Sequence, residues 1–242
     1  MKQWILFLLL LLTPLLAEVK VLNYKATFGM FGTVGLIENR LTFKGNHYTI
    51  DTTVTLKGLA KMMLGGQKEH YISMGHLEKG VMVSDHYIMT TQKKHKKIEK
   101  EYIIDHKRHR VTKIYTKWVD EKRVKHTKKV LDFYAKDDLL TLYFNMDRVI
   151  RAKGVTYHLK AVGLEKQKGL VDVVVPSPKE EKAYRKDLGE SANWYAKALI
   201  VQKNFKKKKG DILLSVADDG YIQKAVIKDI LFYGDAQLIR TK

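Results

Sequence analysis

Residues 47–56, HYTIDTTVTL, alternate apolar and polar side chains along their whole length. One face carries the apolar side chains Tyr48, Ile50, Val54 and Leu56. A period of two with one apolar face is typical of a half-buried antiparallel strand. Lys44-Gly45-Asn46 just before it predicts a tight turn from a preceding strand over residues 34–43.

The same alternation predicts strands along most of the chain. The further candidates are residues 19–28, 67–75, 81–91, 98–105, 110–119, 155–162, 170–175, 194–201, 212–217 and 221–233. Asp218-Asp219-Gly220 joins the last two as a hairpin. Because 221–233 is long for a single strand, we expect it to curve or to carry a bulge.

Evidence for helices is sparse. The best candidate covers residues 137–150, where Asp137 would cap the free amides and the apolar side chains cover more than one stripe. Shorter helices are predicted over 59–64, ended by Gly65-Gly66, and over 179–188, ended by Gly189. We therefore expect a mainly β protein: a single curved antiparallel sheet, or half-barrel, wrapped around one main helix.

The N-terminus has the pattern of a signal peptide over residues 1–17. A short positive segment precedes the apolar run Trp4 to Leu12, and Ala17 is a small residue at the expected cleavage point before Glu18. The run is too short to span a bilayer comfortably, although an uncleaved anchor stays open as the alternative. No cysteine follows it, so lipoprotein attachment is excluded. We expect a single exported, periplasmic domain over residues 18–242.

The chain carries a formal net charge of +19, and 37 of its 45 cationic residues are lysine. Proteins that recognise DNA bases use mainly arginine, whereas this chain uses mainly lysine, so we expect no nucleic-acid partner. A lysine-rich surface favours diffuse attraction to polyanions, such as anionic lipid or lipopolysaccharide, or serves only as a solubilising coat. Composition alone does not separate these two interpretations.

Two segments stand out as candidate contacts. Residues 93–129 hold 15 Lys and Arg against 5 Asp and Glu, and we predict an anion-contact face there, made of Lys107, Arg108, Arg110, Lys113 and Lys117. Lys113 and Lys117 should share a strand face with Val111 and Tyr115, opposite to Ile114 and Trp118. The alternative is a solvent-exposed outer face of the sheet, whose lysines prevent aggregation through the strand edges.

The second segment is the predicted helix around Met62 and Met63. Paired methionines could line an adaptable apolar pocket, together with Leu142 and Met146 of the main helix; ordinary core packing is the alternative. We expect Leu142 and Met146 to be buried against the sheet.

No residue pattern indicates catalysis, a metal or a cofactor. Without cysteine there is no thiol chemistry, and His106 and His109 lie in a predicted turn among cations that repel a dication. No serine lies in a Gly-x-Ser-x-Gly motif. Gly29, Gly32 and Gly35 lack the following helix of a phosphate cradle and predict a strand bend or turn instead.

Several segments together resemble a known family. They are Tyr24 to Gly29, the Gly32/Gly35 pair, Asp138 to Tyr143, Leu213 to Asp218, Ala225 to Lys228 and Phe232 to Gly234. With the secretion signal, they are similar to the bacterial exported family called domain of unknown function 3108. The resemblance implies a single β-rich periplasmic domain, similar to the half-barrels of lipoprotein carriers, and implies no catalytic residues.

The sequence thus leaves two functions open. One is a non-enzymatic periplasmic binding or shuttle protein for a lipid-like or anionic envelope ligand. The other is a structural or interaction factor of the cell envelope that docks a partner protein or polymer. An enzyme ranks third.

Overall fold

The protein is described by a computed structural model that covers residues 17–63, 65–164, 168–201, 209–230 and 234–241. Residues 1–16 of the predicted signal peptide, and the end of the strand predicted over 221–233, lie outside the described residues. No helix in the described ranges is long and apolar enough to cross a membrane.

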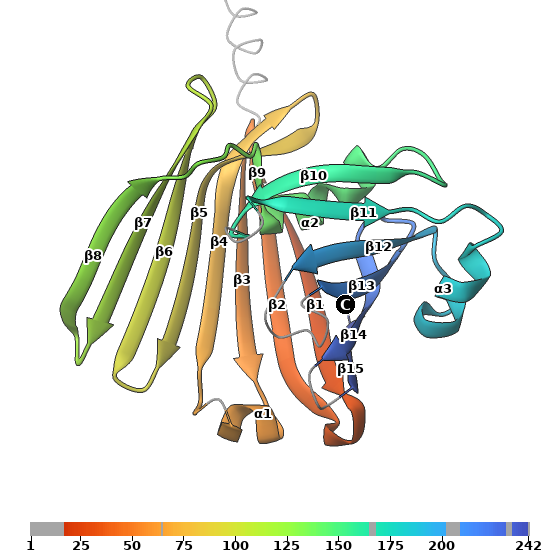
Figure 1. Cartoon of the computed structure of the whole chain (residues 1–242), viewed down its shortest axis with the longest axis horizontal. Helices are drawn as coiled ribbons and strands as arrows, with labels where there is room; N and C mark the ends of the chain where they lie inside the picture. Colours follow the sequence, from red (N-terminus) through yellow and green to blue (C-terminus); the bar gives the residue numbers. More distant parts are fainter. Residues whose placement is uncertain (1–16, 64, 165–167, 202–208, 231–233, 242) are drawn as a thin grey trace, which may run out of the picture.

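The described chain is mostly strands, and they form one large sheet (Figure 1). The first eight strands are β1 (Glu18–Phe28), β2 (Thr33–Lys44), β3 (His47–Leu56), β4 (Lys68–Glu78), β5 (Val81–Lys93), β6 (Lys96–Asp105), β7 (Arg110–Val119) and β8 (Lys122–Val130). The others are β9 (Asp137–Asp138), β10 (Thr156–Val162), β11 (Leu170–Val174), β12 (Trp194–Val201), β13 (Lys209–Val216), β14 (Ile222–Ile230) and β15 (Gly234–Arg240).

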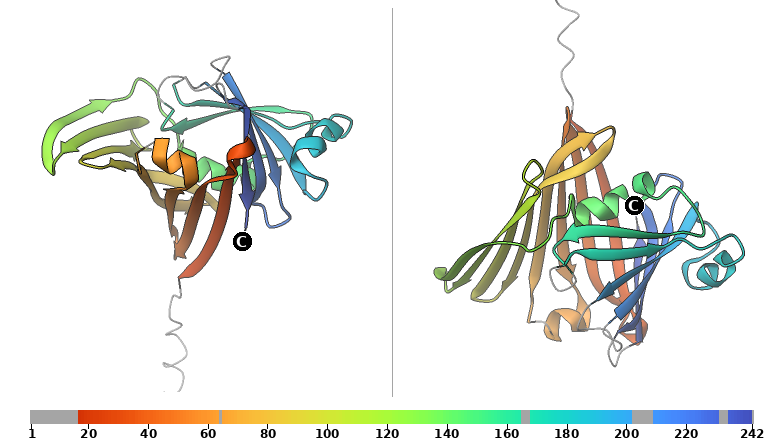
Figure 2. Two further views of the ribbon diagram at one scale, coloured as in Figure 1. Left: turned by 90° about the horizontal axis from the view of Figure 1, so that it is seen from below. Right: turned by 45° about the horizontal axis from the view of Figure 1, so that its top comes forward.

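The first and last strands meet in the middle of this sheet. The spatial order runs from β8 back to β1, then from β15 back to β9. Each half is therefore a meander of neighbouring antiparallel strands, and among the described strands only β9 and β10 pair in parallel. The sheet curls so that the two halves face each other (Figure 2).

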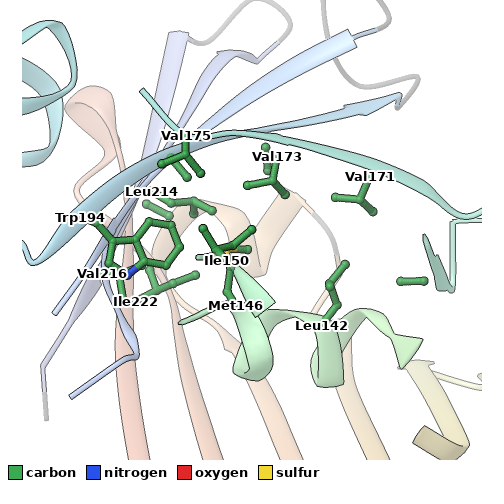
Figure 3. Close-up of a cluster of buried hydrophobic side chains, with 14 of the residues drawn as sticks. Leu142, Met146, Ile150, Val171, Val173, Val175, Trp194, Leu214, Val216 and Ile222 are labelled. Atoms are coloured by element: carbon green, nitrogen blue, oxygen red, sulfur yellow. The ribbon is translucent and has the colours of Figure 1, made fainter. Parts of the chain in front are cut away.

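The main helix, α2 (Leu139–Val149), lies between the two halves (Figures 1 and 2). Leu142, Met146 and Ile150, which directly follows the helix, pack against strands β10 to β14, in the cluster drawn in Figure 3. From other sides of the helix, Phe144 and Leu140 pack against the β1–β3 side. Burial on more than one stripe explains why the helix shows no single apolar face in the sequence.

Three short elements complete the described chain. A 3-10 turn at Gly29–Phe31 connects β1 to β2, and it is followed by Gly32 at φ 64°, a conformation that favours glycine. This turn confirms the bend predicted from the glycines. Helices α1 (Gly58–Met63) and α3 (Glu181–Leu188) lie within a residue or two of their predicted ranges.

The structure confirms the fold class: a mainly β protein whose one curved sheet wraps around one main helix. Three details of the prediction are wrong. The residue that caps α2 is Asp138, because Asp137 is held in β9 by pairing with Ala161. Strands β8 and β15 were not predicted.

Leu142→Asp should abolish stable folding. Leu142 is 4% exposed between α2 and the sheet, and an unpaired buried carboxylate costs as much as the few kcal/mol by which domains are stable. Thermal unfolding followed by circular dichroism tests this. The control is Leu36→Asp on β2, because the Leu36 side chain is 42% exposed and its replacement buries no charge. Similar melting of the two variants would mean that the helix is not central.

Candidate functional site

Five lysines gather on one side of β6, β7 and β8. Lys113 is directly opposite Lys129, and Lys117 is directly opposite Lys125. Between these two pairs lies Tyr115, which has Lys100 on one side and Thr127 on the other. Directly opposed residues of antiparallel strands point to the same side, so all these side chains share one face. We call this set, Lys100, Lys113, Lys117, Lys125 and Lys129, the lysine face.

The lysine face lies on the side of the sheet that α2 covers. Tyr102 on β6 and Val111 on β7 lie two residues from Lys100 and Lys113 and so point to the same side as the lysines. Both are fully buried in a cluster against which Leu140 of α2 packs. The face therefore continues the inner surface of the half-barrel beyond the helix. The nine residues of β8 are all exposed, so the alternative of a solvated basic face stays a prediction beside the anion-contact face.

Within β6, β7 and β8, no carboxylate lies on this face. The acids of β6, Glu99, Glu101 and Asp105, alternate onto the opposite side, where Glu101 bonds the His86 ring at 2.7 Å and Glu99 pairs with Lys97 at 3.0 Å. Strands β7 and β8 contain no acid at all. Across these three fully described strands, the inner face thus carries lysines and no Asp or Glu.

A shallow hollow of about 150 Å³ lies in the lysine face. It is lined by Lys113, Tyr115, Lys125, Thr127 and Lys129. The Lys125 ammonium lies 5.7 Å from the centre of the Tyr115 ring, and that of Lys113 lies 5.8 Å from the Tyr102 ring. Both are cation–π distances, so the aromatic rings help to position the charges.

The structure divides the predicted anion-contact face. Lys113 and Lys117 lie on the inner face with Val111 and Tyr115, as predicted. Lys107, Arg108 and Arg110 lie at the β6–β7 turn, where Arg108 and Arg110 face Asp105 at 3.5 and 3.8 Å. The sequence analysis missed Lys125 and Lys129, because β8 has no apolar face to reveal it as a strand. It missed Lys100 because the register that places it opposite Tyr115 is not visible in the sequence.

The structure does not bring the four predicted pocket residues together. Met62 and Met63 on α1 are 77% and 63% exposed, so the alternative of core packing is wrong for them. Leu142 and Met146 are buried in the core between α2 and the C-terminal strands.

A second polar group lies at the end of the sheet where β4 meets β5. Asp85 accepts a hydrogen bond from His76 Nδ1 at 2.9 Å and lies 3.2 Å from His106 Nε2, which bonds the Ser84 carbonyl oxygen at 2.9 Å. His106 also bonds the Tyr134 hydroxyl at 2.8 Å, so it is not the solvated turn residue that the sequence suggested. The Asp85 carboxylate raises the pKa of His76. Within the described ranges, no three His, Cys, Asp or Glu side chains are arranged to hold a metal ion.

Behind this end of the sheet, Asp137 and Asp138 are adjacent and largely enclosed. Burial, and then the Asp138 charge, raise the pKa of Asp137 to about 7. One Asp137 oxygen, Oδ1, is buried without a hydrogen-bond partner in the described structure. This carboxyl group therefore gains and loses its proton near neutral pH.

No known family model matches this chain, and no curated protein matches its sequence. The resemblance to domain of unknown function 3108 therefore stays a prediction. Among solved structures, the chain is similar to a β-barrel-like protein of domain of unknown function DUF1849 from Brucella abortus. The two are 11% identical, with a TM-score of 0.45 over 91% of this chain and 93% of that one. A similarity of this size says nothing about function.

Asp137→Asn should stabilise the protein at pH 8 and have less effect at pH 5. The folded-state pKa of about 7 lies above the ordinary value of 3.8, so the folded state binds more protons between these values. Stability therefore falls as pH rises through this window, and the neutral amide removes that loss. We expect the melting temperature to rise by about 4 °C or more at pH 8.

The control for this prediction is Asp132→Asn, which changes an exposed carboxylate in the same segment. Its melting temperature should follow that of the unmodified protein at both pH values. An Asp137→Asn gain that is as large at pH 5 as at pH 8 would contradict the assignment of a raised pKa.

Proposed function

We propose that this protein is an exported, non-enzymatic binding or shuttle protein of the periplasm. Its ligand is lipid-like and anionic, and the inner face of β6–β8 holds the charged end of that ligand. The observation that carries the proposal is the lysine face: five neighbouring lysines around Tyr115 on the inner side of three strands, with every acid of those strands on the other side.

The charge arrangement supports binding because it concentrates positive charge at one place on the inner face. Lys113 faces Lys129 and Lys117 faces Lys125, so two lysine pairs flank Tyr115. An anion that enters the curl meets cations from three neighbouring strands.

Apolar side chains lie next to the lysines on the same face. In register across the sheet, Tyr71 of β4 is opposite Met89 of β5, which is opposite Lys100 of β6. Tyr71 and Met89 are partly buried against the cluster that contains Leu140. An acyl chain can follow this row while its anionic end meets the lysines, which is the division expected for an amphipathic ligand.

A second candidate function is docking of an acidic partner protein or envelope polymer. Strand β8 is an edge of the sheet, and all nine of its residues are exposed. An extended acidic segment could pair with this edge. The lipid proposal is preferred because the lysines of β6 and β7 face inward, where an edge-pairing partner would not contact them.

Replacing Lys113, Lys125 and Lys129 together by Gln should weaken binding of an anionic lipid at least about tenfold, since each lysine near an anionic surface contributes about 1 kcal/mol. Isothermal titration with monomeric dihexanoyl phosphatidylglycerol measures this, and neutral dihexanoyl phosphatidylcholine should bind much more weakly. All three side chains line the hollow, so the variant removes charge from one place.

The matched control replaces Lys44, Lys160 and Lys182 by Gln, which removes the same charge from exposed positions elsewhere. This variant should bind phosphatidylglycerol as the unmodified protein does. An equal loss in both variants would show that only total charge matters. If neither lipid binds at low salt, the lipid proposal is wrong and docking at β8 becomes the better account.

A further inference from the structure

We infer that the end of the sheet that carries α1 docks on the surface of an anionic lipid bilayer, where Met62 and Met63 enter the interface between headgroups and acyl chains. We call this surface, residues 57–68 with the neighbouring β1–β2 turn, the α1 end. It shares no residue with the lysine face, and the inference does not depend on the ligand that the lysine face binds. It concerns the place where the protein meets a membrane.

The α1 end presents large apolar side chains to solvent. Met62 and Met63 are 77% and 63% exposed, the two highest values among the large apolar side chains that the structure describes. The β1–β2 turn lies at the same, lower end of the sheet in Figure 1. It adds Phe31, which is 37% exposed and stacks on Phe28. Apolar side chains that are exposed together mark an interaction site.

The backbone of α1 is held in place by hydrogen bonds. At the end of the helix, the Gly66 N–H donates to the Lys61 carbonyl oxygen at 2.7 Å. The Gly65 N–H donates to the Met62 carbonyl oxygen at 3.1 Å, which completes a Schellman motif. Just before the helix, the Lys57 N–H donates to a carbonyl oxygen of β2 at 2.9 Å. The two methionines are therefore exposed by an ordered backbone.

Positive charge surrounds the two methionines. The segment 57–68 contains no Asp or Glu and three exposed lysines: Lys57, Lys61 and Lys68. From β5, the Lys93 side chain reaches Gly65 at the end of α1. The neighbouring segment 28–36 carries no charged residue. Apolar side chains ringed by lysines, without acids, are complementary to an anionic bilayer surface.

Lysine and methionine also divide the depth of such an interface between them. A lysine buries its apolar stem and keeps its ammonium group at the level of the headgroups. Methionine is long and unbranched, so it adapts to an irregular apolar environment. The side chains at the α1 end can therefore be satisfied together by one bilayer surface.

The small size of the apolar area favours a bilayer over a protein partner. A stable protein interface buries about 800 Å² on each partner and needs a surface of matching shape. Two methionines and a partly exposed Phe31 on six residues of helix and one turn supply much less than this. A bilayer deforms around inserted side chains and needs no matching shape.

A fluorescent label at position 62 tests the insertion directly. The chain has no cysteine, so Met62→Cys provides a unique attachment point for the dye NBD. On vesicles of phosphatidylglycerol and phosphatidylcholine, the emission should shift to the blue and become stronger, because the dye leaves water. Vesicles of phosphatidylcholine alone should give a much smaller change. The same label on Val124→Cys, at a side chain of β8 that is 55% exposed, should not respond.

Met62→Ser combined with Met63→Ser should weaken binding to the phosphatidylglycerol vesicles at least about tenfold, since both variants remove apolar surface that the interface buries. Vesicle flotation measures this with protein purified from a bacterial periplasm. The matched control is Val124→Ser with Val130→Ser, which removes two apolar side chains that are 55% and 56% exposed on β8. The control should bind vesicles as the unmodified protein does.

The lysines of the α1 end have a separate test. Replacing Lys57, Lys61 and Lys68 together by Gln should weaken binding to the phosphatidylglycerol vesicles at least about tenfold. The Lys44/Lys160/Lys182→Gln variant removes the same charge elsewhere and should bind nearly as the unmodified protein does.

Monomeric dihexanoyl phosphatidylglycerol separates this inference from the proposed function. The Met62→Ser/Met63→Ser variant should bind this lipid as the unmodified protein does, because neither methionine belongs to the lysine face. If that variant also binds vesicles normally and the label at position 62 stays in water, the docking inference is overturned, and a protein partner becomes the better occupant of the α1 end. The proposed function then still stands on the binding of monomeric lipid.

Two other results are decisive. If the methionine variant and its valine control lose vesicle binding equally, general apolarity drives the binding and the inference is overturned. If monomeric lipid does not bind, but the label at position 62 enters phosphatidylglycerol vesicles and the methionine variant alone loses them, the docking inference stands and the proposed function fails.

Discussion

The buried carboxylate of Asp138 is the contact on which the rest of the structure depends. Its Oδ1 atom accepts hydrogen bonds from the backbone N–H groups of Leu140 and Thr141, at 2.7 and 3.0 Å. These two bonds cap the N-terminus of α2. Its Oδ2 atom accepts the hydroxyls of Ser73 on β4, at 2.5 Å, and of Thr141, at 2.9 Å. Thr141 is in turn bonded to Tyr48 on β3 at 2.6 Å. Burial raises the pKa of Asp138, and the Ser73 and Thr141 hydrogen bonds oppose that rise. Because a buried carboxylate without these partners is costly, the helix start and two strands must come together as one unit.

A helix fixed in this way determines how the sheet curls. One turn further along, the Asn145 side chain bonds both backbone groups of Met82 on β5, at 2.7 and 3.1 Å, so α2 is tied to the N-terminal half at two points. Trp194 on β12 donates to Asp147 at 2.7 Å and ties the C-terminal half to the end of the same helix. Between these ties, Leu142 and Met146 fill the space between the halves. The helix is too short to cover β6–β8 as well, which leaves the lysine face open on the inner side of the curl.

Much of this fold could be predicted from the sequence. Strands with one apolar face, such as His47–Leu56 and Arg110–Val119, have the predicted bounds because alternation is visible wherever one face is buried. The nine exposed residues of β8 have no such face, and the backbone pairing with β7 alone makes them a strand. The sequence analysis could place Lys113 and Lys117 on one face, but not Lys125 and Lys129 opposite them, since register between strands is set by long-range packing. For the same reason, the sequence could not show that Asp138 rather than Asp137 caps α2, since its partner Ser73 is far away in the chain.

Native-state hydrogen exchange, measured residue by residue across a series of denaturant concentrations, tests this account most directly. If Asp138 joins α2 to the sheet, the amides of Leu140 and Thr141 should open with the same free energy as the ladder amides of β3, β4 and β13, as one cooperative unit. If the α2 amides instead open at a clearly lower free energy while both halves of the sheet stay protected, the helix is an addition to an independently stable sheet, and the central claim is contradicted.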